Sequence, residues 1–282
     1  MPQTTTDLLN RGINANQTDK FRRGNLVCLP AKGSLIVSGD IHGHRRNFER
    51  LVTCADLAGH PDRHIVLQEI IHGGPEDEAG GCLSYQLLFK AIQLKIDFPD
   101  QVHFVMGNHD TACISISEVM KSGKEMNRAM SSALEREFQR TSPEVKLAIR
   151  QFLFSQPLAV KCANRTWISH SLPADRFVEA FDFSVFDREL TISDCQKPGP
   201  VYVLTWGRRH SQQTLNRMAR RLDVDIFVVG HQAQPKGWRQ AGENLIILAS
   251  DHNHGYLLPV DLARTYTLGS LASALVPLAS IS

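Results

Sequence analysis

Six residues with metal-ligating side chains are spread over about two hundred positions of this chain, each at or near the end of a short apolar run. Three of these runs are SLIVSG, VHFVMG and DIFVVG, and in each of them a polar side chain directly follows the glycine. Carboxylates, imidazoles and a carboxamide are donors that suit a pair of divalent cations, and two such cations can acidify a water that they share. Their types and placement predict a two-metal site made of Asp40, His42, Glu69, Asn108, His170 and His231.

The elements that must position these residues follow from hydrophobic period and turn residues. An apolar run that ends in glycine is typical of a buried strand, and sites in open α/β sheets assemble at the carboxyl ends of strands. In the first half, strands are predicted at 34–38, 64–69 and 101–106, and helices at 44–58 and 82–96. Later, a helical segment is predicted at about 116–154, a helix at about 211–222, and strands at 158–162, 165–169, 201–205, 225–229, 244–249 and 255–260.

This order of elements indicates an α/β fold with a two-sheet core flanked by helices. The first half alternates strand and helix while the second half is rich in strands, which fits two sheets better than a barrel of identical units. We expect a single domain over 1–282, with a core at about 34–260 and short extensions at both ends. The last fourteen residues, GSLASALVPLASIS, either pack against the body, cover a neighbouring subunit or form a disordered tail.

Composition argues against several classes of protein. The net charge is +2 and charges of both signs are interspersed, so neither nucleic acid nor a membrane surface is an expected partner. Six cysteines stand far apart with no C-x-x-C pair, which argues against a zinc ribbon and a disulfide scaffold. No stretch has the apolar length of a signal peptide core or a transmembrane helix, so a cytoplasmic location is expected. The oligomeric state stays open.

The motifs GDIHGH, GNHD, SHS and VVGHQ follow one another in this order, and here the chain resembles the calcineurin-like metallophosphoesterases. The family signature is D-x-H, then GD, then GNH with an acidic residue, then two separated histidines. The likeness covers about residues 34–260 and is strongest to the branch of phosphoprotein phosphatases and dinucleoside tetraphosphatases, because FPDQVHFVMGNHD looks like the region leading to their GNHE. The resemblance implies an αββα sandwich that hydrolyses phosphate esters with two divalent metal ions.

The resemblance also implies which residues hold each metal. Asp40 and His42 would bind the first ion, and Asn108, His170 and His231 would bind the second. An imidazole-rich site favours Mn, Fe or Zn over Mg, and the asparagine with its carboxylates makes Mn the first expectation, with Fe, Zn and Mg as alternatives.

The second motif departs from the family pattern. IVLQEIIHGG stands where the family has GDxxDRG, so Glu69 would replace the bridging Asp and Gln68 the glycine before it. By the same alignment, His72 occupies the place of the orienting Asp and Gly73 that of a phosphate-binding Arg. The alternative for Glu69 is a side chain that faces solvent beside a weakly held second metal.

His109 is the best candidate for the general acid, because it directly follows the ligand Asn108. Asp110 could orient it, but points the wrong way if that stretch is extended. Arg208 or Arg209 stands where the family has a second arginine and would hold phosphate oxygens; Arg45 and Arg46, nearer in sequence to the first metal, are the alternative pair. His252, in SDHNHG, would bind substrate or replace the missing carboxylate; a plain turn is the alternative.

These departures leave several substrates open. A small phosphomonoester is ranked first, and a phosphopeptide or phosphoprotein and a dinucleoside polyphosphate are the alternatives. A catalytically impaired metal-binding or interaction module is the rival of another class. A phosphodiesterase or nuclease is disfavoured, because the chain has no basic stripe.

Overall fold

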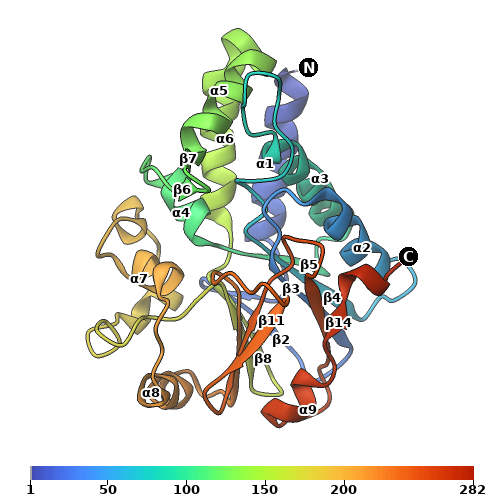
Figure 1. The fold of residues 1–282 in the computed structure, drawn as a ribbon, viewed down its shortest axis with the longest axis vertical. Coiled ribbons are helices and arrows are strands. Elements are labelled where there is room, and N and C mark those ends of the chain that lie inside the picture. Colours follow the sequence, from blue (N-terminus) through green and yellow to red (C-terminus); the bar gives the residue numbers. More distant parts are fainter. Residues whose placement is uncertain (1) are drawn as a thin grey trace.

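Two sheets pack face to face with helices around them in the computed structural model, which describes residues 2–282 (Figure 1). Strand residues alternate between the two sides of each sheet. On β3, Leu35 and Val37 belong to the apolar cluster between the sheets, whereas Ile36 belongs to the cluster beneath the helices. This period of two buries both faces of the sheet and confirms the predicted two-sheet architecture.

The five-stranded sheet contains the strands that precede the first motifs. Its order is β14 (Val276–Pro277), β13 (Tyr256–Asp261), β3 (Ser34–Asp40), β4 (Arg63–Gln68) and β5 (Val102–Val105). Strands β3, β4 and β5 are parallel, so their carboxyl ends meet at one edge of the sheet.

The seven-stranded sheet contains the strands that precede the two separated histidines. Its order is β1 (Arg22–Arg23), β2 (Leu26–Leu29), β8 (Ala159–Cys162), β9 (Thr166–Ser169), β10 (Ile226–Val229), β12 (Leu245–Leu248) and β11 (Trp238–Ala241). Strands β9 and β10 are parallel, and their last residues Ser169 and Val229 are paired. The two sheets touch at this end, because Asp40 forms a parallel bridge with Ala249. Residues that follow strands of either sheet can therefore reach a common site.

Helices connect the strands and cover the outer faces. They are α1 (Pro2–Gln17), α2 (Arg45–Ala55), α3 (Ser84–Asp97), α4 (Asn108–Ile114), α5 (Met126–Phe138), α6 (Ser142–Ser155), α7 (Pro200–Trp206), α8 (Gln212–Leu222) and α9 (Leu268–Ala272), with 3-10 turns at Gln139–Thr141, Phe183–Phe186, Ile192–Cys195 and Leu278–Ser280. Helix α1 packs against α3 and α6 in the upper part of Figure 1. None of the helices in residues 2–282 has the length and apolar character needed to cross a membrane.

The helical segment predicted at 116–154 is wrong over its first ten residues. Residues 120–125 form a two-stranded hairpin, β6 (Met120–Lys121) and β7 (Lys124–Glu125), and regular helix begins only at Met126. The two residues at its tip, Ser122 and Gly123, have φ angles of +53° and +79°, as a tight two-residue turn requires. The Ser-Gly pair between two lysines was the local signal for this turn.

The strand predicted at 201–205 is also wrong, because this segment forms helix α7. Its β-branched residues favoured a strand, but Pro200 stands in the first turn, where its fixed φ suits a helix. Val201, Leu204 and Thr205 are buried at helical spacing. Of the three alternatives for the C-terminal segment, packing against the body is observed, since β14 pairs with β13 and Leu278 is buried.

A buried ion pair joins the N-terminal segment to the helix α3. Lys95 Nζ lies 2.8 Å from Asp19 Oδ2, and the two side chains are 1% and 2% exposed. His103 Nδ1 donates to the same carboxylate oxygen at 2.8 Å. Burial alone would raise the pKa of Asp19, but His103 and Lys95 outweigh it and lower this pKa below its usual value. Asp19 is therefore ionised and neutralises a buried lysine.

Replacing Asp19 with asparagine is expected to destabilise the fold by about 3–5 kcal/mol, because it leaves the Lys95 ammonium buried without a counter-charge. Urea unfolding at neutral pH measures this change. The control is Asp62→Asn, which breaks an exposed pair with Lys32 whose side chains are 73% and 64% exposed; this change should cost under about 1 kcal/mol. Equal losses in the two variants would contradict the expectation.

Candidate metal centre

The six predicted ligand residues lie together where parallel strands of the two sheets end. Asp40 is the last residue of β3, and Glu69 directly follows β4. Asn108 begins helix α4 shortly after β5, and His170 directly follows β9. All six are nine-tenths or more buried: Asp40, His42, Glu69, Asn108, His170 and His231. The alternative that Glu69 faces solvent is wrong, since it is 1% exposed.

The first group of donors consists of Asp40, His42 and Glu69. His42 Nε2 lies 3.8 Å from Asp40 Oδ2 and 3.9 Å from Glu69 Oε2. His42 Nδ1 lies 3.0 Å from the carbonyl oxygen of Ile71, to which a neutral ring donates its proton. The lone pair is then on Nε2 and faces the two carboxylates, which is the arrangement that a metal-binding histidine needs.

The second group consists of Asn108, His170 and His231. Asn108 Oδ1 lies 2.9 Å from His170 Nε2 and 2.8 Å from His231 Nδ1, and these two nitrogens are 3.2 Å apart. An amide oxygen and two imidazole nitrogens therefore point at one another in a buried space. When both nitrogens are unprotonated, these three acceptors are satisfied by one cation among them.

Glu69 connects the two groups. Its Oε2 lies 3.9 Å from His42 Nε2 and 3.8 Å from His170 Nε2. Glu69 also belongs to both sets of acidic and imidazole side chains whose ligand atoms lie close enough to hold an ion, with His42 and His109 in one set and Asp40 and His170 in the other. This oxygen is buried, and no donor in residues 2–282 makes a hydrogen bond to it. A buried carboxylate oxygen without a donor is costly unless a cation compensates it. The residues present thus fit divalent cations, with Glu69 among the donors.

The pKa values of the site also favour a bound cation, because the carboxylates are buried. Burial raises the pKa of Asp40 to about 7 and raises that of Glu69 well above its usual value, and Asp110 and Asp40 raise the latter further. Burial lowers the pKa values of His170 and His231 well below the usual value, so both rings are neutral. The imidazoles already have the protonation state of ligands, whereas the positive charges near the carboxylates do not offset their burial.

Two glycines make room for the carboxylates. A Cβ on Gly107 would lie 1.9 Å from Glu69 Oε1, and one on Gly230 would lie 2.2 Å from Asp40 Oδ1. Close approach at Gly230 also allows the backbone N–H of the next residue, His231, to donate to Asp40 Oδ1 at 2.9 Å. The glycines that precede the ligands in GNHD and VVGHQ are therefore required by close approach.

His109 lies beside this centre and contacts His72. Its Nε2 is 4.0 Å from Glu69 Oε2, and its backbone N–H donates to Glu69 Oε1 at 3.0 Å. The Nδ1 atoms of His109 and His72 are 3.0 Å apart. From the sequence, His72 was noted only as the residue in the place of the family's orienting Asp. In the structure its ring contacts the candidate general acid. Asp110 does not, because the segment is helical and its carboxylate accepts from the N–H of Gly107.

Two cationic side chains, one after helix α7 and one on the β6–β7 hairpin, affect the pKa values of the centre. Arg208 is exposed; burial raises the pKa of Asp40 and lowers those of His170 and His231, and the charge of Arg208 opposes the first shift and adds to the other two. Lys121 acts on Asp40, His42 and Glu69 from the β6–β7 hairpin, where its Nζ lies 3.5 Å from Asp251 Oδ2. Sequence reasoning missed Lys121, since it did not find the hairpin.

The other two candidate substrate ligands have different surroundings. Arg209 is exposed, and its backbone carbonyl accepts from the N–H of Asp175 at 3.2 Å. His252 uses both ring nitrogens within its own neighbourhood: Nε2 lies 2.9 Å from the carbonyl of Gln234, and Nδ1 accepts from the N–H of His254 at 3.2 Å. These contacts favour the alternative role for His252, a residue that stabilises the turn.

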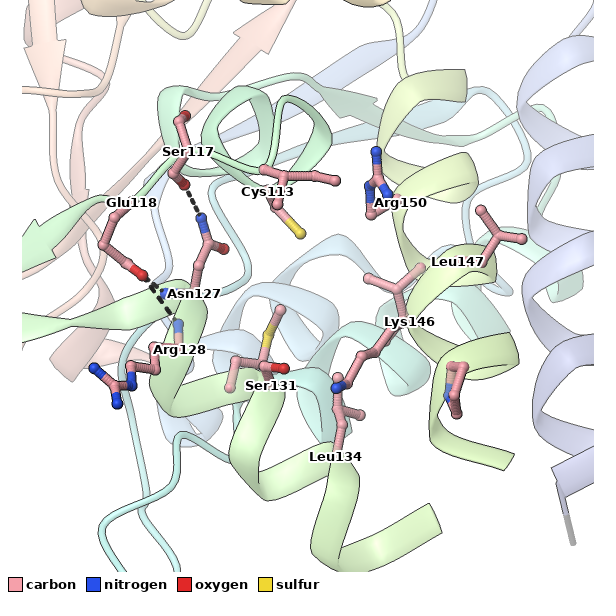
Figure 2. A pocket seen from close by; sticks show the side chains of 14 residues that line it. Cys113, Ser117, Glu118, Asn127, Arg128, Ser131, Leu134, Lys146, Leu147 and Arg150 are labelled. Carbon is pink, nitrogen blue, oxygen red and sulfur yellow. Dashed lines mark hydrogen bonds between the residues drawn. The ribbon is translucent and has the colours of Figure 1, made fainter. Parts of the chain in front are cut away.

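A cavity of about 530 Å³ lies beyond the other end of α4, between the segment after this helix and helices α5 and α6 (Figure 2). Leu134 and Leu147 line it together with the cationic side chains of Lys146 and Arg150. None of the six ligand residues lines it, so this cavity is separate from the metal centre.

The chain matches the family model of the calcineurin-like phosphoesterases over residues 33–235. No curated protein matches it. Among solved structures it is similar to a protein serine/threonine phosphatase from Saccharomyces cerevisiae with similarity to human phosphatase PP5, at 16% identity and a TM-score of 0.70, covering 99% of this chain and 93% of that one. It is also similar to a cold-active protein-tyrosine phosphatase of a psychrophile, Shewanella sp., at 17% identity and a TM-score of 0.60, covering 89% and 82%. These likenesses show the fold, and the family match shows that the chain belongs to the calcineurin-like phosphoesterase family.

Proposed function

We propose that the protein is a metal-dependent phosphatase that hydrolyses a phosphomonoester, on a small molecule or on a phosphoprotein, at a centre of two divalent cations. The observation that carries this proposal is the position of Glu69 Oε2. It is buried without a hydrogen-bond donor among the described residues and lies within 4.0 Å of imidazole nitrogens of His42, His109 and His170. A carboxylate oxygen in this position is suited to bridging two cations.

When bound, such a pair of cations lowers the pKa of a water and offsets the charge that develops on the phosphoryl group. Mn is the first choice by its donor preferences, and Fe, Zn and Mg also suit the donors. Asp40, His42 and Glu69 would hold the first cation. Glu69 would also hold the second, together with Asn108 Oδ1, His170 Nε2 and His231 Nδ1.

His109 would act as the general acid through Nε2, the ring nitrogen that faces Glu69. Its other nitrogen contacts His72 at 3.0 Å, and this contact limits rotation of the ring. A carboxylate in the place of His72 would also stabilise a protonated His109, whereas an imidazole brings no negative charge. His72 is therefore proposed to orient the acid without adding charge to the site.

Arg208 and Lys121 are proposed to attract the phosphate oxygens. Arg208 influences the pKa values of His170 and His231, and Lys121 those of His42 and Glu69. Two cationic side chains near a site favour a substrate that carries two negative charges, which a monoester does and a diester does not. This is why a monoester is ranked before a diester.

The test is hydrolysis of a chromogenic aryl phosphate by the purified protein with Mn²⁺, with Fe²⁺, Zn²⁺ or Mg²⁺ in its place, and after chelation. We expect turnover that depends on metal and exceeds turnover of the matching diester. His109→Asn should lower kcat about 10²-fold, the usual effect of losing a general acid, while metal content stays unchanged. His254→Asn, at an exposed histidine, is the matched control. Absence of turnover with all four metals would overturn the proposal in favour of a non-catalytic module.

A further inference from the structure

Gln68 is the last residue of β4, and its buried carboxamide lies between Ser38 and His170. Its Nε2 donates to the backbone carbonyl oxygen of Ser38 at 2.8 Å. Its Oε1 lies 3.1 Å from His170 Nδ1. The side chain is 0% exposed, so no solvent competes for either contact.

These two contacts determine where the proton of His170 is. A carbonyl oxygen only accepts, so the NH₂ end of the amide must face Ser38 and the oxygen end must face His170. The amide oxygen also only accepts, so His170 Nδ1 must carry the proton. The lone pair of the ring is then on Nε2, which lies 2.9 Å from Asn108 Oδ1 and 3.2 Å from His231 Nδ1.

Asp40 is the only nearby carboxylate in residues 2–282 with an ion-pair contact to this ring nitrogen, and it is engaged elsewhere. Its Oδ1 lies 3.6 Å from His170 Nδ1, which is longer than a hydrogen bond, and accepts from the backbone N–H of His231 at 2.9 Å. Gln68 is therefore the residue that makes the hydrogen bond to His170 Nδ1.

We propose that Gln68 is a positioning residue that holds His170 in its Nδ1–H tautomer and so presents Nε2 as a metal donor. The inference rests on the proposed function, in which His170 binds the second cation. Metal-binding histidines usually donate their other N–H to a carboxylate, a backbone carbonyl or water. A neutral amide performs the same task beside Asp40 and Glu69 without placing another negative charge in a buried site.

The first test needs no metal. In metal-free protein with ¹⁵N-labelled histidine, the two ring nitrogens of His170 are distinguished by NMR, and the signals are assigned by their loss in His170→Asn. We expect a protonated Nδ1 and an unprotonated Nε2 in the wild type, and a shift toward the other tautomer in Gln68→Leu. A wild-type ring protonated on Nε2 would overturn the inference, even if Gln68→Leu does not fold.

The second test measures binding of Mn²⁺ alone by calorimetry. We expect Gln68→Leu to weaken one of the two cation sites by about 10–100-fold and to leave the other unchanged. The matched control is Gln101→Leu, which removes an amide that donates to the carbonyls of Leu57, His60 and Arg63 at the opposite end of β5 from Asn108. Both variants lose hydrogen bonds, but only the first should lose metal affinity.

The outcomes separate the two proposals. Equal affinities of the wild type and Gln68→Leu for both cations would overturn the role of Gln68 and leave the phosphatase proposal standing. A wild type that binds no second cation would overturn the proposed function. The NMR comparison of the wild type with Gln68→Leu would still show whether Gln68 determines the tautomer of His170.

Discussion

Replacing Glu69 with glutamine is expected to lower kcat/KM by about 10³-fold and to remove one of the two proposed cations, because the change removes a negative charge at the centre of the site. Glutamine has nearly the same shape, so the change removes the negative charge and leaves packing intact. In the present site, a single oxygen of Glu69, Oε2, lies within 4.0 Å of the Nε2 atoms of His42, His109 and His170. Metal content of the purified variant and initial rates on an aryl phosphate measure the two effects.

The control for this variant is Glu76→Gln, at an acidic residue of the loop that follows the second motif. Glu76 pairs with Lys124 at 2.7 Å and its side chain is 49% exposed, so its loss should change the rate less than about twofold. Two cations and wild-type rates in Glu69→Gln would show that the carboxylate does not bridge. The bridging role of Glu69 would then fail, whereas the loss of both cations together with all turnover would show that the whole centre depends on this carboxylate.

The placement of the ligands could be predicted from the sequence because each ligand stands at or shortly after the end of a strand, with Asp40 and His42 sharing β3. Three apolar runs that end in glycine gave the strands, and parallel pairing of β3 with β4 and of β9 with β10 brings their ends together. What could not be predicted is the contact between elements far apart in sequence. The 3.0 Å contact of His72 with His109 joins residues 37 positions apart, and neither flanking sequence indicates it.

The two errors in the secondary structure have local causes. At 201–205 the β-branched residues outweighed Pro200, which starts a helix. At 116–125 the composition favoured a helix, and the two-residue turn of the hairpin was not predicted. Lys121 was therefore expected on a helix, and its effect on the pKa of Glu69 was not foreseen. Composition averaged over a long window misses such a short hairpin.

Replacing Gly107 with alanine is expected to lower turnover about 10²-fold by displacing Glu69, because a remote change that misplaces a ligand by about 1 Å has an effect of this size. The backbone at Gly107 has φ −105° and ψ −179°, which alanine adopts without strain. The new Cβ, however, would lie 1.9 Å from Glu69 Oε1 and 2.4 Å from its Cδ. The carboxylate must therefore move, and its hydrogen bond from the N–H of His109 must break or lengthen.

The double variant Gly107→Ala with Glu69→Asp separates this cause from general damage. Aspartate is one methylene shorter, so it relieves the contact, and the double variant should bind Mn²⁺ more tightly than Gly107→Ala alone. Gly269→Ala is the control, because nothing lies within 4 Å of the added Cβ; it should keep both metal binding and stability. Strictly additive losses in the double variant would mean that the alanine acts elsewhere, since only residues in contact couple in such a cycle. Coupling between the two positions would show that the glycine of the GNHD motif is required by the length of the carboxylate at position 69.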